Sequence, residues 1–290
     1  MSPVRLRMRF ATMAGSLLAA AAALAVTTND DPVEAAIKAI EDRTRPDEQR
    51  AAARNAIVLA MTRGDKAAAE RLLARAEKAA DDNVRMHFAI VLAHTRDQRD
   101  KEDRLVKVPA LPQEFIPQAV ELLAKWLAAK DGDSALRLWA ALGIANSRGE
   151  RAIALLKELV LAPDGNVVLR AAVARALGEW RGDRLVKEAM PILVALLGDK
   201  SPEVRVAACD ALRITQLNRR VAVDPLFKVA REDPDEAAWR AAVAALRALG
   251  GGNLQISPGG DDAERKQKLD AWYKVWAARQ PRETEAPKEE

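Results

Sequence analysis

A period of about 35 residues is the feature that most restricts how this 290-residue chain can fold. Asp164 is followed six positions later by Arg170, and Asp199 is followed six positions later by Arg205. Arg240 comes 35 residues after Arg205. A fixed period of this length is typical of solenoid proteins, in which each unit buries its apolar face only against its neighbours.

The periodic arginine also occurs in the first half of the chain. Arg50 and Arg85 are 35 residues apart, whereas Arg137 follows Arg85 by 52, which is one period plus about 17 residues and indicates an insertion. We interpret the periodic residues as a structural ladder of ion pairs that fixes how successive units stack. The ladder residues are Asp131, Arg137, Asp164, Arg170, Asp199, Arg205, Arg240, Arg50 and Arg85.

The composition predicts an all-α protein. Good helix formers dominate, aromatic residues make up only 4%, and β-branched or aromatic runs of strand length are missing. The period then divides the chain into about six helical hairpins. The predicted segments are hairpins 1–2 at 31–94, a charged inserted loop or extended helix end at 95–112, hairpins 3–6 at 113–249, a Gly-rich linker at 250–260, a capping helix at 261–279 that carries Leu269, Trp272 and Trp276, and a disordered tail at 280–290.

The clearest copy of the repeated pattern, Asp-x5-Arg-x6-Leu, runs from Asp199 to Leu212. This pattern resembles HEAT-like repeats of the armadillo-type α-solenoid family, and weaker copies extend the resemblance over about 31–249. The resemblance implies a right-handed α-solenoid, a fold generally used as a binding scaffold, and it implies no catalytic residue. The sixth unit departs from the pattern, because Arg247 stands where Leu212 stands in the fifth.

The first 25 residues have the plan of a secretory signal peptide. Three arginines precede an apolar run from Phe10 to Ala25, which ends in a small-x-small motif. We expect cleavage after Ala25 and a periplasmic or secreted protein, with an uncleaved N-terminal membrane anchor as the alternative. Removing this segment lowers the count of Lys and Arg from 46 to 43 against 42 Asp and Glu, so the net charge falls from +4 to +1.

The sequence contains no recognisable catalytic or metal-binding motif. His87 and His94 are the only histidines, and we expect His87 to be a packed helix residue. Cys209 is the only cysteine and lies in an apolar helix, where a buried, inert thiol is expected. We therefore predict no enzyme activity, no metal and no cofactor. The enzymatic alternative, a HEAT-like lyase or base-excision enzyme, would need a polar pocket that holds Asp210 beside Trp180.

The predicted second helices of the hairpins are apolar nearly all round. Small residues such as Gly178 should let neighbouring second helices approach closely. Because basic residues are sparse on this face and the mature charge is close to zero, a nucleic-acid-binding solenoid remains a minor alternative. We expect a non-catalytic scaffold of the cell envelope that binds an unidentified protein partner, with the 95–112 insertion as its partner-specific feature. Candidate partner-binding residues are Arg175, Trp180 (expected to be partly exposed), Asp210, Arg213 and Arg247.

Overall fold

The computed structural model describes residues 31–99, 103, 105–129, 133–161, 166–180, 183–215, 219–250, 254 and 261–279. The predicted signal peptide, Asp131, Asp164, most of the Gly-rich linker and the C-terminal tail lie outside these residues. The chain divides into two compact units, Met1–Ala176 and Leu177–Glu290.

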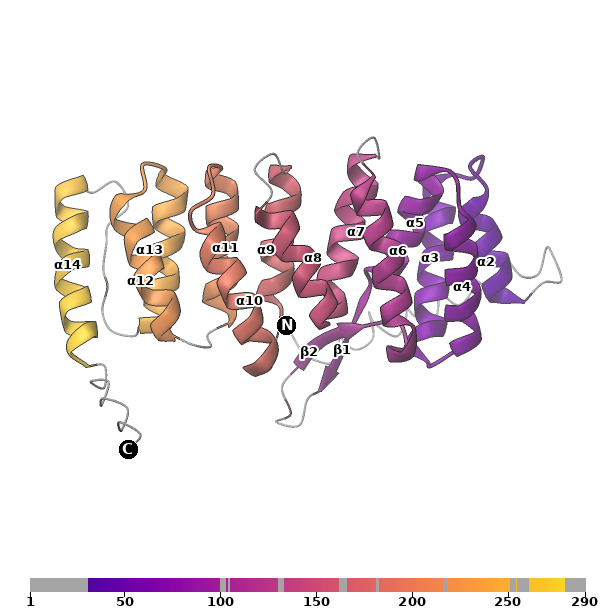
Figure 1. Cartoon of the computed structure of the whole chain (residues 1–290), viewed down its shortest axis with the longest axis horizontal. Helices are drawn as coiled ribbons and strands as arrows, with labels where there is room; N and C mark the ends of the chain where they lie inside the picture. The colour runs from indigo at the N-terminus through magenta and orange to yellow at the C-terminus, as the bar shows by residue number, and fades with distance from the viewer. Residues whose placement is uncertain are drawn as a thin grey trace, which may run out of the picture. The chain divides into compact units, whose positions relative to one another are not determined.

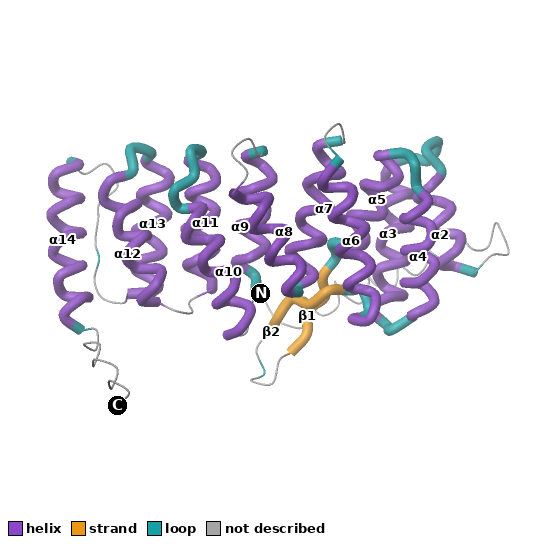
Figure 2. Tube along the Cα trace, viewed as in Figure 1, coloured by secondary structure: helices purple, strands orange, loops and turns teal. Residues whose placement is uncertain are grey.

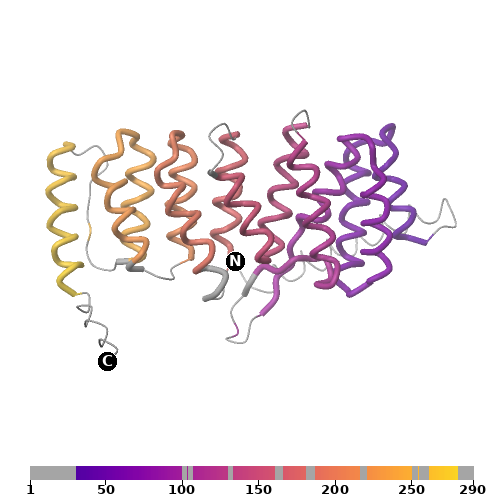
Figure 3. Tube along the Cα trace, viewed as in Figure 1, coloured from indigo at the N-terminus to yellow at the C-terminus, as the bar shows by residue number. Residues whose placement is uncertain are grey.

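The first unit is built from helices that follow one another as hairpins (Figure 1). The helices are α2 (Pro32–Glu41), α3 (Asp47–Thr62), α4 (Lys66–Lys78), α5 (Asp82–Leu92), the 3-10 turn η1 (Gln113–Phe115), α6 (Ile116–Ala128), α7 (Ser134–Ser147), α8 (Glu150–Leu161) and α9 (Val167–Gly178), whose last two residues belong to the second unit. The first helices α2, α4, α6 and α8 pack in one row, and the second helices α3, α5 and α7 pack in another. Chain order is therefore also spatial order within this unit (Figure 3).

Aspartate side chains start several of these helices. Asp31 accepts hydrogen bonds from the Val33 and Glu34 amides at 2.9 and 3.3 Å, as expected for a residue that precedes α2. Asp65, Asp81 and Asp133 cap α4, α5 and α7 in the same way. Each such cap stabilises its helix by about 1 kcal/mol, because it satisfies amides that have no partner within the helix.

The inserted segment differs from the predicted loop or helix end. It forms an antiparallel β-hairpin of β1 (Thr95–Arg99) and β2 (Leu105–Pro109), which Figure 2 shows in orange among the helices. The hairpin leaves and rejoins the helical framework at adjacent points, since the Ala110 amide donates to the His94 carbonyl at 2.9 Å. Within the described residues, these are the only two strands.

The second unit continues the hairpin pattern. Its helices are α10 (Asp183–Leu196), α11 (Pro202–Thr215), α12 (Arg219–Glu232), α13 (Glu236–Gly250) and α14 (Asp262–Ala278). The second helices α11 and α13 pack together, and α14 packs against α12 as a first helix would. Leu269 and Trp276 of α14 are buried, so this helix covers the end of the last hairpin as predicted.

Small residues bring second helices into close contact. A Cβ added at Gly178 would lie 2.8 Å from the Cα of Ala211, and one added at Gly143 would lie 2.7 Å from Leu123 and 3.6 Å from Ala93. The predicted close approach is therefore confirmed at Gly178. The all-α prediction and the helical hairpins are also confirmed for the described residues.

The helices of the described residues are too short or too polar to cross a lipid bilayer.

Candidate functional site

The β-hairpin presents two chemically different faces. Successive strand residues point to opposite faces, and the register pairs Arg96 with Val108 and Asp97 with Lys107. The Asp97 carboxylate lies 2.7 Å from the Lys107 ammonium, so these charges neutralise each other on one face. The other face carries Arg96 and Gln98 beside Val108, and among these described residues its one charge is the positive charge of Arg96.

A groove of about 460 Å³ lies between this basic face and the ends of α3 and α7. Its apolar lining includes the buried side chains of Met61 and Leu111. Two arginines also line it, Arg96 from the hairpin and Arg148 from the end of α7. None of the described residues that line the groove is acidic. Both the volume and the mixture of apolar floor with a few polar groups are typical of ligand sites.

Arg148 has an unusual backbone conformation for its residue type. Its φ of 58° lies in the left-handed region, and it ends α7 at a position where glycine is the usual residue. For a residue with a Cβ this conformation costs roughly 1–2 kcal/mol. Strained residues of this kind cluster at functional sites, so Arg148 directs attention to the groove that it lines.

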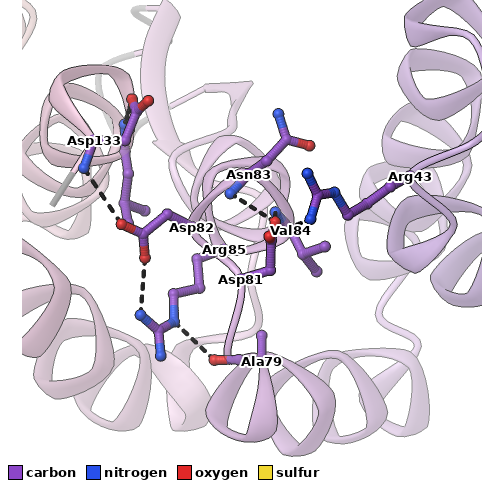
Figure 4. Close-up of polar contacts among 9 residues, drawn as sticks. Arg43, Ala79, Asp81, Asp82, Asn83, Val84, Arg85 and Asp133 are labelled. Atoms are coloured by element: carbon purple, nitrogen blue, oxygen red, sulfur yellow. Dashed lines mark hydrogen bonds and ion pairs between the residues drawn. The ribbon is translucent and has the colours of Figure 1, made fainter.

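Two ladder arginines of the first unit, Arg50 and Arg85, bind carbonyl groups at the ends of first helices. Arg85 donates through Nε to the Ala79 carbonyl after α4 at 2.7 Å, and through Nη1 to Asp82 at 2.9 Å (Figure 4). The second oxygen of Asp82 accepts from the Asp133 amide at 3.4 Å, which connects the start of α5 with the start of α7. Beside them, Arg43 donates to Asp81 at 2.8 Å.

Arg50 has the same double role. It is 5% exposed, and its Nε and Nη2 donate to the Ile40 carbonyl at 3.1 and 2.9 Å. Its Nη1 donates to Asn83 in the next hairpin at 2.7 Å. A cation at the C-terminal end of a helix is favourable because the last carbonyl groups carry partial negative charge. Burial lowers the pKa of Arg50, which nevertheless stays charged.

In the second unit, Arg205 joins two successive hairpins. Its Nε and Nη2 donate to the two carboxylate oxygens of Asp233 at 2.6 and 2.7 Å, and its Nη1 donates to the Asp199 carbonyl at 2.8 Å. The Asp199 side chain does not take part, since it accepts from the Ser201 amide instead. Burial raises the pKa of the Asp233 carboxyl, but hydrogen bonds from Arg205 and the Asp235 amide outweigh it and hold this pKa below its usual value.

Arg240 makes different contacts although it occupies the same place in the repeat. It pairs with Glu236 of its own helix at 2.5 Å, both side chains being largely exposed. The buried position near Trp239 is taken by Arg265 of α14, which lies 4.6 Å from the Trp239 ring centroid and donates to the Arg231 carbonyl at 3.4 Å. The repeat pattern does not point to Arg265, because α14 lies beyond the Gly-rich break in the period.

The ladder arginines in the middle of the chain, Arg137 and Arg170, lie in different surroundings. Arg170 is buried, and Arg137 lines a pocket of about 280 Å³ together with Asn166. Their predicted partners Asp131 and Asp164 lie outside the described residues.

The predicted partner-binding residues do not form one site. Trp180 is completely buried, so the expectation of partial exposure is wrong, because the neighbouring helices cover it. Asp210 accepts from Arg213 at 3.3 Å, a pair one turn apart on α11 with both side chains half exposed. Arg175 and Arg247 are exposed, and Arg247 donates to the Leu254 carbonyl at 2.5 Å.

His87 is a buried helix residue, as predicted, at 1% exposure. The Arg54 guanidinium contacts its Nδ1, which must therefore be the unprotonated nitrogen. Burial, assisted by the positive charges of Arg50 and Arg54, lowers the pKa of His87 to about 4. The imidazole is thus neutral at physiological pH.

Cys209 is also buried as predicted. Burial raises the pKa of its thiol to about 12, so it carries no thiolate at neutral pH. In the part of the chain that the structure describes, no cluster of three or more His, Cys, Asp or Glu side chains could hold a metal ion.

Comparisons with known proteins identify part of the repeat region. An engineered protein matches at 21% identity over 76% of this chain and 97% of its own, with a TM-score of 0.45. A computationally designed armadillo repeat protein for modular peptide recognition matches at 17% identity over 74% and 98%, with a TM-score of 0.42. Human deoxyhypusine hydroxylase matches at 18% identity over 75% and 73%, with a TM-score of 0.38. Likeness at these TM-scores supports no conclusion about function, and no curated protein matches the chain.

The family comparison is more specific. Residues 160–247 match the family of HEAT repeats, and they include the Asp199–Leu212 copy from which the resemblance was inferred. The predicted resemblance to the HEAT-like repeat family is therefore confirmed, and it is carried by residues 160–247.

Proposed function

We propose that this protein is an exported, non-catalytic scaffold that binds a protein partner through the β-hairpin inserted between its second and third helical hairpins. The observation that carries the proposal is the hairpin itself, which departs from the repeat plan and stands beside a groove with a basic, partly apolar lining. Repeat proteins tolerate insertions on one face, and such insertions commonly carry the binding function.

The rest of the framework supports a structural role. Three of the periodic arginines, Arg50, Arg85 and Arg205, bind helix ends or neighbouring hairpins, which is the role expected of residues that hold repeats together. Arg50 donates three hydrogen bonds to the Ile40 carbonyl and the Asn83 side chain. Arg205 donates four to the Asp233 carboxylate and to the carbonyls of Asp199 and Lys200. Export rests on the N-terminal sequence alone, where Arg5, Arg7 and Arg9 precede the apolar run.

Deletion of the hairpin tests the interaction role. The His94 carbonyl and the Ala110 amide are 2.9 Å apart, so a two-residue Asn-Gly turn can replace residues 95–109 without straining the helices on either side. The matched control replaces only residues 100–104 by Asn-Gly and keeps β1 and β2 paired. Both variants and the wild type are tagged and purified from envelope fractions, and bound proteins are identified by mass spectrometry.

The expected outcome is that the full deletion loses a partner that the wild type and the control retain, with circular dichroism at 222 nm unchanged per helical residue. An identical set of bound proteins for all three would contradict the proposal.

Export is checked separately by the mass of the mature protein, which should correspond to a chain that begins at Val26. A full-length protein in the cytoplasmic fraction would contradict it.

A further inference from the structure

The groove beside the β-hairpin has a lining that selects for a particular kind of ligand. We propose that it binds an extended peptide segment of a partner protein whose alternate side chains are acidic. This inference rests on the proposed function and specifies the chemistry of the partner.

The charges around the groove favour a carboxylate. Arg96 and Arg148 approach it from different elements, and no described lining residue is acidic. The nearest acidic residues of the same segment are already paired: Asp97 with Lys107 on the opposite face of the hairpin, and Glu114 with Lys66 at 2.9 Å. Among the described residues, the charges that line the groove are therefore positive. Guanidinium groups bind carboxylates in a bidentate geometry that fixes orientation as well as charge.

The neutral polar groups of the groove suit a peptide backbone. The hydroxyl groups of Thr62 and Ser147 donate to the Val58 and Ile144 carbonyls of their own helices, both at 2.7 Å. Their protons are thus in use, while their oxygen lone pairs can accept from peptide N–H groups. A ligand that brings N–H donors together with carboxylates matches this lining better than a free inorganic anion does.

The hairpin adds an unpaired strand edge. β2 lies against α7, so β1 is the outer strand, and its outer edge has no strand partner among the described residues. An extended segment can pair with such an edge through its main chain. Because side chains alternate along a strand, every second side chain of the added segment would share the face of Arg96 and Gln98. This geometry predicts acidic residues at positions i and i+2.

The apolar floor defines what the remaining side chains should be. Met61, Leu111 and Ile116 line the groove with Val108 of the hairpin. A volume of about 460 Å³ accommodates only a short stretch of peptide. We therefore infer a short acidic motif that includes at least one apolar residue.

Selection from a library of random peptides tests this inference directly. Phage that display peptides of about a dozen residues are selected on the full chain, and the enriched peptides are synthesised for fluorescence anisotropy. Enriched peptides should carry Asp or Glu at alternate positions. Changing those residues to Asn or Gln should weaken binding by about tenfold or more, because charge-assisted hydrogen bonds are lost.

Variants of the chain locate the bound peptide. Arg96→Gln and Arg148→Gly should each weaken binding by about tenfold or more. Arg148→Gly should also relieve the backbone strain at this position, because glycine adopts the left-handed conformation without strain, and urea unfolding of this variant measures its stability separately from its affinity. The matched control, Lys107→Gln, removes a positive charge from the opposite face of the same hairpin and should leave the affinity nearly unchanged.

Several outcomes would overturn the inference. These are the absence of enriched peptides, enrichment without an excess of acidic residues, and equal binding by wild type and both arginine variants. Displacement of the peptide by equimolar glutarate would indicate a site for small dicarboxylates, and displacement by equimolar oligothymidylate would indicate a nucleic-acid site. Because the hairpin deletion is tested with native envelope proteins, a failure here would leave the proposed scaffold function standing.

Discussion

Arg205 and Arg240 occupy equivalent places in adjacent repeats, yet the structure predicts very different costs for removing them. The Arg205 and Asp233 side chains are 12% and 5% exposed, and Arg205 contributes two of the hydrogen bonds that the Asp233 carboxylate accepts. Arg205→Ala leaves that carboxylate buried with the Asp235 amide as a remaining donor at 2.9 Å. Removing one member of a buried ion pair typically costs about 3–5 kcal/mol, and we expect a loss in this range.

Arg240→Ala is the matched control. Arg240 and Glu236 are 44% and 63% exposed and lie one turn apart on the same helix, and pairs of this kind contribute about 0.3–0.5 kcal/mol. The assay is equilibrium urea unfolding at pH 7, followed by circular dichroism at 222 nm, in which the shift of the midpoint gives the change in free energy of unfolding. Equal losses for the two variants would refute the assignment of Arg205 as the residue that joins the hairpins.

A second comparison separates buried charge from lost packing. If the cost of Arg205→Ala arises from the uncompensated Asp233 carboxylate, then adding Asp233→Asn should recover part of the stability. The pH dependence has a defined sign. The pKa of Asp233 is lowered in the folded state, so the ion pair stabilises the protein above the usual Asp pKa of 3.8, and this contribution is lost as the pH falls through the lower folded value. The difference between wild type and Arg205→Ala should therefore shrink in acid.

Three further predictions concern buried positions. Because the pKa of His87 falls from 6.5 to about 4 on folding, the free energy of unfolding should decrease by on the order of 3 kcal/mol as the pH is lowered from 6.5 to about 4. His87→Gln should flatten that pH dependence in urea titrations at a series of pH values, and parallel curves for the two proteins would contradict the prediction. Gly178→Ala should destabilise by about 1–3 kcal/mol in thermal unfolding, because its Cβ would collide with Ala211, whereas Gly149→Ala, which meets nothing within 4 Å, should be nearly neutral. Cys209 should resist Ellman's reagent in the native protein and react fully in urea, and rapid native labelling would show that the thiol is accessible.

The helical framework could be predicted from sequence because its period is a physical necessity. Each hairpin must bury an apolar face against the next, so residues such as Leu177 and Leu212 recur at matching places and are fully buried. The caps could be predicted for a similar reason. Asp31 stands directly before Pro32, and both residue types favour the start of a helix on local grounds alone.

The β-hairpin could not be predicted in the same way. β1 has the sequence Thr-Arg-Asp-Gln-Arg, in which only Thr95 favours strands, so its extended conformation depends on pairing with β2. The sequence of β2 does favour a strand, because its Leu-Val-Lys-Val run shows partial alternation of apolar and polar residues between Leu105 and Val108. A highly charged segment with two prolines masked it, and the groove that it forms with α3 and α7 depends on contacts between distant parts of the sequence.

The hydrogen-bond partners of the periodic arginines also could not be predicted from the repeat pattern. The periodic arginines were recognised, but many of their acceptors are backbone carbonyls such as those of Ile40 and Ala79, which every residue possesses. Trp180 illustrates the same limit for burial. Its position at a helix end beside polar residues suggested exposure, whereas its complete burial is decided by the helices that pack over it.

The contrast between the second helices and the inserted hairpin explains why a binding site is expected at the insertion. Where second helices approach as closely as Gly178 and Ala211 do, small side chains fill the contact and leave little room for groups that could recognise a partner. Arg50, Arg85 and Arg205 cannot readily serve as recognition groups either, because releasing one of them would leave helix-end carbonyls or a buried carboxylate without a donor. Arg96 on the exposed strand carries no such obligation in its strand pairing, since the ion pair between β1 and β2 is made by Asp97 and Lys107 on the opposite face. A repeat protein of this kind therefore acquires specificity most readily where the chain leaves the repeat.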